Sequence, residues 1–396
     1  MTSPTLLGQL SNLHEMQQLL LTSIPTEEAS RQIQLQLPSL SWLYASGVYL
    51  ELYWLRAFLQ QDDQLTHPIH HLFNPGHLSL AEQCNQLPPI EHLIRWADEI
   101  RDEHLRQLAT PGMLGDHPQL ADDRLVWFLV QEQAKRYEQM LEVLNQRQLQ
   151  QPQTHCCSHI LQPHAPAWET RELSQGHYRI GARNDPRAYD NEQPPQAVEL
   201  SSFRIALTPV SNAEYLAFMS AGGYEDKALW SSAGRHWLES SSQFRPEYWR
   251  QDDAGNWYEI AINGSSDLPP NEPVAGINRY EAEAFAQWVS RLGEEYEGAV
   301  LQHEYQWEIA ARGGVLRQIG RVWEWCSNTF HTYPDYEPFP GKQPSADAQQ
   351  TILRGASLHT QQELRRSSLR HWASPVEHHH FAGTRLVFPA RHQWSE

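Results

Sequence analysis

The first 150 residues carry the hydrophobic spacing of α-helices. Leu6, Leu10, Leu13 and Met16 recur three or four positions apart, so they fall on one face of a helix. Similar helical stretches are predicted over residues 40–59, 90–108 and 121–149. The connecting segments are short, apart from the one after residue 59. The pattern therefore predicts an antiparallel four-helix bundle over residues 1–150.

The pattern changes after the fourth helix. Residues 151–166 are polar and interrupted by proline, which is typical of a linker. From residue 167 to residue 396 the chain alternates short strands with Gly, Pro and Asn turns. Helices are predicted here over residues 212–221, 279–292 and 304–312, the first of them capped by Ser211. We therefore expect the second domain to be an irregular α+β fold.

Charge narrows the choice of partners. The 396 residues include 30 Lys and Arg against 48 Asp and Glu, a formal net charge of −18. Nucleic acids and anionic membranes would be repelled, so neither is expected as a primary partner. The first basic residue is Arg31, which leaves no positively charged start of a signal peptide. No apolar run reaches the roughly 18–20 residues that span a bilayer, and we expect a soluble, cytoplasmic protein.

The four cysteines do not form the pattern of a disulfide framework. Two of them, Cys156 and Cys157, are adjacent and lie in the linker near three histidines, His155, His159 and His164. These side chains could bind a metal ion, but nothing in the sequence fixes their geometry. A flexible linker that happens to contain them is the favoured interpretation.

Several stretches of the second half resemble the formylglycine-generating-enzyme-like fold, a C-type-lectin-like α+β domain. The resemblance rests on motifs that occur in the family's order, at residues 208–218, 221–224, 229–230, 272–274, 280–284, 304–312, 322–325, 353–357 and 381–386. Formylglycine-generating enzymes carry a pair of Cys shortly after the motif at 353–357. Residues 358–365 contain no Cys, so copper-thiolate oxidase chemistry is not expected here.

Other sequence features of the second domain resemble those of the sulfoxide synthases of ergothioneine and ovothiol biosynthesis. The short interval from Arg312 to Val322, the segment 333–336 and residues 370–372 carry this second resemblance. Those enzymes also have an N-terminal DinB-type helical bundle. The bundle predicted here resembles it at Trp42, Glu51, Trp54, Leu55 and residues 72–75. The resemblance implies non-haem iron(II) chemistry in which a thiol is joined to a histidine betaine.

The resemblance also implies where the iron should be bound, and the expected ligands are missing. In the family, one His follows the first-helix Trp by four positions, and two more form a His-x-x-x-His pair on the last bundle helix. Here the matching positions hold Ser46, Glu132 and Arg136, or Gln131 and Lys135 if the register shifts by one. We expect Arg136 either to lie at the vacated metal position, balancing Glu132, or to form an exposed helical ion pair with it.

A second departure concerns the thiol substrate. The family carries Arg residues in the loop after its Leu-Phe-Asn element, suited to the carboxylates of a substrate such as γ-glutamylcysteine. Residues 75–94 contain no Lys or Arg. An iron site could be rebuilt from His67, His70, His71 and His77 with Glu132, a less favoured alternative because loop histidines more often face solvent. Residues 377–380, which include three consecutive His, are another candidate ligand set, although a solvated turn is the favoured interpretation.

Other residues are candidates for binding or packing. Five pocket candidates come from the second domain: Trp323, Glu324, Arg354, Arg370 and Arg385. The aromatic element is expected to pack the core. The Arg residues are expected to form buried ion pairs with Glu308 or Glu324, or else to line a pocket for a carboxylate ligand. The segment 190–192 is expected to be a turn, and Cys326 a small buried residue.

The leading hypothesis is a sulfoxide synthase homologue that has lost the iron and acts by binding, a pseudoenzyme with no cofactor and no identifiable catalytic residue. Its partner would be a histidine-derived or thiol metabolite, or an active paralogue. The alternative is an active Fe(II)-dependent oxygenase, forming a C–S bond with a relocated ligand set that includes His70, His71 or His77. A third class is a ligand-display module built on variable surface loops.

Overall fold

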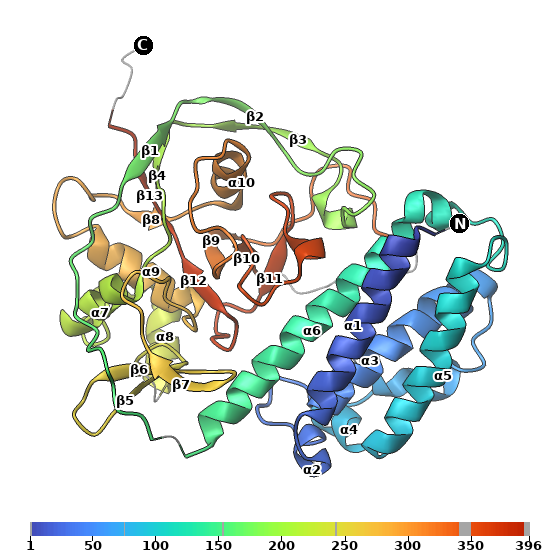
Figure 1. The fold of residues 1–396 in the computed structure, drawn as a ribbon. Helices are drawn as coiled ribbons and strands as arrows, with labels where there is room; N and C mark the ends of the chain where they lie inside the picture. Colours follow the sequence, from blue (N-terminus) through green and yellow to red (C-terminus); the bar gives the residue numbers. More distant parts are fainter. Residues whose placement is uncertain (1, 75, 153, 242–243, 340–349, 392–396) are drawn as a thin grey trace. The chain divides into compact units, whose positions relative to one another are not determined.

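The computed structural model describes residues 2–74, 76–152, 154–241, 244–339 and 350–391 (Figure 1). These residues form two compact units. The first comprises Met1–Gln150 together with the short segments Asp185–Arg187 and Thr360–Leu364. The second comprises Gln151–Asn184, Ala188–His359 and Arg365–Glu396.

The first unit is helical (Figure 1). Its α-helices are α1 (Pro4–Thr22), α2 (Thr26–Ala29), α3 (Leu40–Leu52), α4 (Leu80–Asn85), α5 (Ile90–Ala109) and α6 (Arg124–Gln150). The π-helical segment η1 (Tyr53–Gln60) continues α3, and the 3₁₀ segments η2 (His67–Leu72) and η3 (Pro118–Asp123) precede α4 and α6. Helices α1, α3, α5 and α6 pack on one another as the four long helices of the bundle, which confirms the helices predicted from the hydrophobic spacing.

The boundaries of these helices follow from local chemistry. Ser39 caps α3 by accepting a hydrogen bond from the backbone N of Trp42. The last helix begins at Arg124, three residues later than predicted, because Asp122 has a left-handed φ of 53° that a helix cannot contain. Leu10, Leu52 and Leu125 are fully buried, and their apolar faces form the interior that holds the helices together.

The described residues of the second unit form four small sheets. One has the order β1 (Thr170–Leu173), β4 (Phe203–Ala206), β13 (Leu386–Pro389), β8 (Val300–Leu301). Another has the order β11 (His371–Ala373), β10 (Thr351–Arg354), β9 (Trp323–Thr329), β12 (Ala382–Thr384). The remaining sheets pair β2 (Gly176–Ile180) with β3 (Gln196–Leu200), and join β5 (Trp249–Gln251), β6 (Trp257–Ala261) and β7 (Gly264–Asp267). Strand β12 runs parallel to β9, whereas the other paired strands are antiparallel.

The second unit also has four α-helices among its described residues: α7 (Asn212–Ser220), α8 (Ser232–Ser240), α9 (Arg279–Val289) and α10 (Glu304–Arg312). Helices α7, α9 and α10 confirm the three predictions, and Ser211 caps α7 in a reciprocal capping box with Glu214. Helix α8 was not predicted. The 3₁₀ segments are η4 (Asp190–Glu192), η5 (Lys227–Leu229) and η6 (Gln362–Leu364), the last of which belongs to the first unit.

The interior of the second unit is aromatic and aliphatic. One cluster packs Trp307 of α10 against Phe203 and Ile205 of β4 and Val387 of β13, so the helix covers that sheet.

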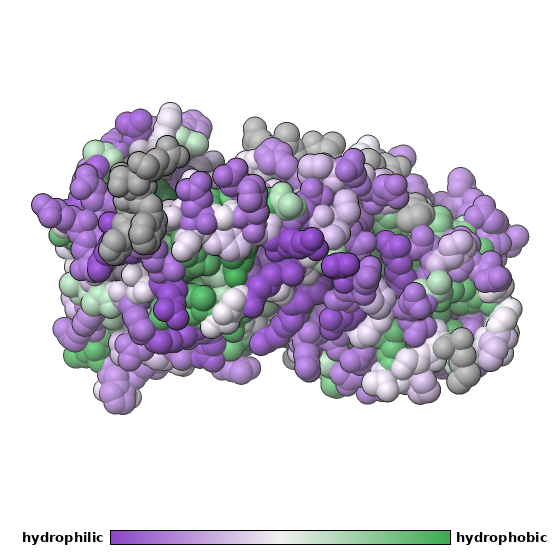
Figure 2. Space-filling view, turned by 90° about the horizontal axis from the view of Figure 1, so that it is seen from above, coloured by the Kyte–Doolittle hydropathy of each residue, from purple (hydrophilic) through white to green (hydrophobic). Residues whose placement is uncertain are grey.

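Figure 2 shows a face on which hydrophilic side chains predominate between scattered hydrophobic ones. Within the part of the chain that the structure describes, no helix combines the length and the apolar character needed to cross a bilayer.

Candidate functional site

The positions of the expected iron ligands lie on α3 and α6. Ser46 is buried on α3, and its hydroxyl donates a hydrogen bond to the carbonyl of Leu43, 2.8 Å away. Arg136 of α6 donates from Nε to the Ser46 Oγ at 3.2 Å and from Nη1 to a Glu132 carboxylate oxygen at 3.3 Å. The structure thus brings Ser46, Glu132 and Arg136 together, with the guanidinium in contact with the other two.

The donor chemistry of these positions does not fit a ferrous ion. A guanidinium carries five N–H donors and no acceptor, and it stays protonated in proteins, so Arg136 offers no lone pair to a metal. Glu132 is engaged by Arg136 and by Lys135, whose Nζ lies 3.2 Å from the carboxylate. A serine hydroxyl is a poor substitute for imidazole at an iron(II) centre. We therefore derive no iron chemistry from this place.

The shifted register gives no better ligand set. Gln131 is buried, and its Nε2 donates to the carbonyls of Trp127 and Arg187 at 3.1 and 2.8 Å. Lys135 is a cation that pairs with Glu132. Neither register places an imidazole on α6.

A polar cluster lies deeper in the bundle, and sequence reasoning missed it. The carboxylate of Glu51, on α3, is fully buried and faces His14 Nε2 at 2.6 Å and His104 Nδ1 at 3.4 Å. The amide of Gln133 donates to the same carboxylate at 2.5 Å. Glu51 is the only charged residue between Leu40 and Leu55, and this isolation in an apolar stretch was the signal that could have found it.

Electrostatics explain how this carboxylate is accommodated. Burial alone would raise the pKa of Glu51, but the facing His14, the hydrogen bonds from both histidines and the nearby Arg101 outweigh it and lower that pKa. Burial lowers the pKa of His14, and the facing Glu51 carboxylate opposes that shift. Among the described residues, the ligand atoms of His14, His104 and Glu51 are not all within 4.8 Å of one another, as an ion would require. The cluster is therefore a hydrogen-bonded core network.

The histidines proposed as a relocated ligand set lie on and after η2. His70 hydrogen-bonds through Nδ1 to the hydroxyl of Tyr49 at 2.8 Å, and its ring centroid is 5.8 Å from that of His77. Burial, with the neighbouring histidines, lowers the pKa of His70. His71 is exposed at the end of the same segment. Within the residues that the structure describes, no three ligand atoms from this group converge.

The three candidate arginines of the second unit are buried in ion pairs. Arg354 pairs with Glu308 at 2.6 Å, Arg370 with Glu304 at 2.8 Å and Arg385 with Glu324 at 2.9 Å. Backbone carbonyls take up further N–H groups of each guanidinium, for example the carbonyl of Asn191 at 2.8 Å from Arg370. Burial opposes the charge of Arg354, but Glu308 and Glu304 outweigh it and raise its pKa.

These contacts favour buried ion pairs, the first of the two alternatives, over a ligand pocket. Glu324 is fully buried, and its carboxylate also accepts hydrogen bonds from Gln302 and from the indole of Trp307. Trp323 is buried on the same strand. All five candidates are therefore enclosed and engaged within the protein, and we do not retain them as ligand contacts. The expected pairing with Glu308 or Glu324 holds for Arg354 and Arg385, whereas Arg370 uses Glu304 instead.

Two smaller expectations are met by the structure. The segment Asp190–Glu192 is a single 3₁₀ turn, and the Glu192 carboxylate accepts a hydrogen bond from the backbone N of Tyr189 at 2.9 Å. Its other partners include Arg366 and the hydroxyl of Ser368, so the turn is also an anchor for a distant loop. Cys326 is fully buried, and burial raises the pKa of its thiol. It is a packing residue rather than a nucleophile.

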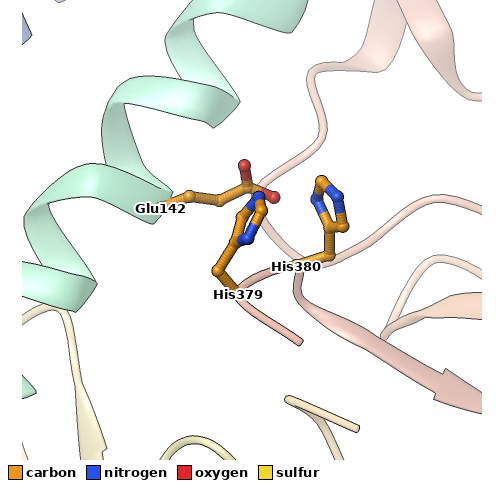
Figure 3. A group of neighbouring side chains, drawn as sticks. All are labelled: Glu142, His379 and His380. Carbon is orange, nitrogen blue, oxygen red and sulfur yellow. The ribbon is translucent and has the colours of Figure 1, made fainter. Parts of the chain in front are cut away.

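The histidines near the C-terminal end do not form the solvated turn expected from the sequence. His379 is 5% exposed, and its ring centroid lies 4.2 Å from that of His380 (Figure 3). The hydroxyl of Tyr248 donates to the His379 carbonyl, and His380 Nε2 lies 3.1 Å from the Glu377 carboxylate. Burial lowers the pKa of His379. Figure 3 also labels Glu142, a residue of α6 in the first unit.

The fold and its buried ion pairs make the second unit an α+β domain of the formylglycine-generating-enzyme-like type. The family model of the sulfatase-modifying factor enzyme 1-like domain matches residues 162–319 and 314–390. The chain belongs to this family.

Several curated proteins are similar to the chain. Hercynine oxygenase of Mycolicibacterium thermoresistibile is 29% identical over 257 residues, covering 54% of this chain and 57% of that protein. Formylglycine-generating enzyme of Thermomonospora curvata is 33% identical over 153 residues, with coverages of 35% and 47%. Inactive C-alpha-formylglycine-generating enzyme 2 of Mus musculus is 26% identical over 211 residues, with coverages of 51% and 64%. The alignments to the hercynine oxygenases span little more than half of those proteins' length.

A solved structure is also similar. PvdO from Pseudomonas aeruginosa aligns with a TM-score of 0.41 and 16% identity, covering 60% of this chain and all of that one. The sequence comparisons support the resemblance to the ergothioneine-type enzymes and the α+β fold predicted from the motifs.

Proposed function

We propose that this chain is an iron-free relative of the sulfoxide synthases and acts by binding rather than by oxygen chemistry. Its ligand would be a histidine-derived or thiol metabolite, or its partner an active paralogue. The observation that carries the proposal is the contact of the Arg136 guanidinium with both Ser46 and Glu132. The family-implied iron positions are thus held together by a cation that belongs to the protein.

Electrostatics support this proposal. A divalent ion placed against a fixed guanidinium is repelled, and the repulsion is strong where the side chains are partly withdrawn from water. The Arg136 side chain is 17% exposed and that of Glu132 is 20% exposed. The pair is therefore more enclosed than an ordinary helical surface pair. Glu132, the one anionic donor at these positions, is already shared between Arg136 and Lys135.

Two further observations agree. Residues 75–94 provide no Lys or Arg for the carboxylates of a thiol substrate. The family also includes a relative whose name describes it as inactive, although that description applies to that protein. A non-catalytic role is therefore compatible with the fold.

The alternative function is an active oxygenase with a relocated metal site. The observation in its favour is the closeness of the His70 and His77 rings, whose centroids are 5.8 Å apart. This alternative predicts that replacing His70, His71 or His77 by Ala abolishes iron binding. The leading proposal predicts no effect of these changes.

The test is anaerobic incubation of the untagged protein with Fe²⁺, followed by metal analysis and by oxygen uptake with a thiol and a histidine betaine. We expect no stoichiometric iron on α3 and α6 and no thiol-dependent oxygen uptake. The triple variant Ser46→His, Glu132→His, Arg136→His is expected to gain iron, because it restores imidazoles at the family's positions. Tight stoichiometric iron in the unaltered protein, with oxygen uptake, would overturn the proposal. Calorimetric titration with the betaine and the thiol tests metabolite binding directly.

A further inference from the structure

The segment that follows α6 belongs to the second unit and is held there by hydrogen bonds, in contrast to the flexible linker expected from the sequence. Asp267, the last residue of β7, accepts hydrogen bonds from the backbone N of Ser158 at 3.1 Å and of His159 at 2.9 Å. The Nε2 atom of His155 lies 2.8 Å from an oxygen of the same carboxylate. A residue more than a hundred positions away therefore fixes the geometry of this segment, and the sequence could not reveal that contact.

The anchoring gathers three potential metal ligands. The ligand atoms of His155, Cys157 and Asp267 all lie within 4.8 Å of one another. The His155 ring also packs against Tyr258 of β6 with centroids 4.9 Å apart, which limits its orientation. The Cys157 thiol donates weak hydrogen bonds to the carbonyls of Asn256 and Trp257 at 3.8 and 3.7 Å.

We propose that His155, Cys157 and Asp267 bind a divalent transition-metal ion of the zinc class. An imidazole nitrogen, a thiolate and a carboxylate are the ligand types that Zn²⁺ uses. Tetrahedral coordination at the usual bond lengths separates neighbouring ligand atoms by roughly 3.3–3.5 Å. An ion therefore requires the side chains to shift, including His155 Nε2 and the Asp267 oxygen, which now lie 2.8 Å apart. The thiol of Cys157 gives up its proton to solvent when its sulfur binds the ion.

His159 is a candidate for the fourth ligand. The Nδ1 atom of His159 lies 3.4 Å from Asp267, and its side chain is 90% exposed, so it can turn toward the ion without disturbing the core. The segment 159–164 and residues 267–271 also line a cavity of about 770 Å³. An ion at this site would therefore lie at the edge of a space large enough for a small molecule. The site shares no residue with the positions on α3 and α6.

The competing explanation is purely structural: Asp267 tethers the segment and the thiol has no role. The two explanations differ at Cys157, since the tether described above uses backbone N–H groups and the side chains of His155 and His159 and does not require the thiol. Cys156, the adjacent and exposed cysteine, provides a matched control. Its replacement changes the thiol count by the same amount without touching the proposed site.

The test is anaerobic titration of the full untagged chain with Co²⁺, followed by competition with Zn²⁺. The unaltered protein and Cys156→Ser are expected to bind one equivalent with a thiolate-to-cobalt charge-transfer band. The band should disappear in Cys157→Ser, and affinity should fall at least about tenfold in His155→Ala and Asp267→Asn. Circular dichroism without metal checks the fold, and if Asp267→Asn does not fold, the Cys157 and His155 variants decide.

The proposal is wrong if the unaltered protein binds no Co²⁺, if binding produces no charge-transfer band, or if the band survives in Cys157→Ser. The Fe²⁺ experiment is repeated in Cys157→Ser as well. Iron that persists in this variant belongs elsewhere in the chain and bears on the proposed function, not on this site.

Discussion

The Nε atom of Arg136 lies 3.2 Å from the Oγ atom of Ser46 and donates a hydrogen bond to it, so that α6 is joined to α3 by a cation. The same guanidinium binds the Glu132 carbonyl at 3.0 Å and its carboxylate at 3.3 Å. The guanidinium is therefore held by hydrogen bonds to residues of two helices, α3 and α6. This arrangement makes the interaction measurable by mutation.

The first prediction concerns this pair. Arg136→Met and Ser46→Ala should each lower the free energy of unfolding. The loss in the double variant should be smaller than the sum of the two single losses. We expect a coupling of about 0.5–1 kcal/mol, because the hydrogen bond is charge-assisted but the arginine remains partly exposed. Urea unfolding of the four proteins measures it. Strict additivity would mean that the two side chains do not interact in solution.

The second prediction concerns the buried arginines. Glu324→Gln should lower the free energy of unfolding by about 3–5 kcal/mol, because it leaves the Arg385 guanidinium buried without a counter-charge. Glu169→Gln is the matched control, since Glu169 pairs with Arg317 on the surface, where both side chains are more than half exposed. The control should cost at most about 1 kcal/mol. Equal losses in the two variants, measured by urea unfolding, would contradict the structural role assigned to Glu324.

The third prediction concerns pH. Burial raises the pKa of Glu281 to about 8, despite the hydrogen bonds that it accepts from Tyr224 and Asn278. Between the ordinary value of 4.5 and about 8, the folded protein holds a proton that the unfolded chain has lost. This group's contribution to stability is therefore fully present below pH 4.5, falls as pH rises, and levels off above pH 8.

Replacement by glutamine removes that dependence. The side-chain amide introduced by Glu281→Gln can accept from the backbone N of Asn278 and donate to the Tyr224 hydroxyl, so the contacts are preserved. From pH 6 to pH 8 the unaltered protein should lose stability relative to Glu281→Gln, by roughly 1.4 kcal/mol for each pH unit. Urea unfolding at the two pH values measures the difference. Parallel pH dependence of the two proteins would show that Glu281 is ionised in the fold.

The parts of this structure that could be predicted from sequence are those set by local pattern. Apolar residues at helical spacing located α1 and placed α5 and α6 within three residues of their observed bounds, and the helix predicted over residues 40–59 corresponds to α3 followed by η1. Helix α8 was missed, since it is only nine residues long, begins Ser-Ala-Gly and contains few apolar residues. The proximity of Ser46 to Arg136 could be anticipated because the resemblance supplied a register for the helices that carry them.

The remaining site features depend on contacts between distant parts of the chain. The carboxylate of Glu51 meets His14 and His104 only when three helices pack, and local pattern says nothing of their rotation. The anchoring of His155 by Asp267 likewise joins residues 112 positions apart. Such polar contacts are specific to one packing arrangement, whereas hydrophobic spacing is shared by many.

The last prediction concerns the close approach of α3 and α6. A Cβ atom on Gly47 would lie 2.6 Å from the Gln133 Oε1 and 3.4 Å from the Arg136 Cδ. The Gln133 amide cannot retreat freely, because it donates to the Gly47 carbonyl at 3.0 Å and to the buried Glu51 carboxylate. Gly47→Ala should therefore destabilise the protein by about 1–3 kcal/mol, although alanine is the better helix former.

Gly8 on α1 is the control, since a Cβ there meets nothing within 4 Å. Gly8→Ala should stabilise the protein by about 0.5–1 kcal/mol, the ordinary gain for this change within a helix. The changes in the free energy of unfolding, measured with urea, should therefore have opposite signs in the two variants. This result is expected only if the neighbouring helix leaves no room for a side chain at position 47. A stabilising Gly47→Ala would mean that α3 and α6 lie farther apart in solution, and the contact of Arg136 with Ser46 would then have to be abandoned as well.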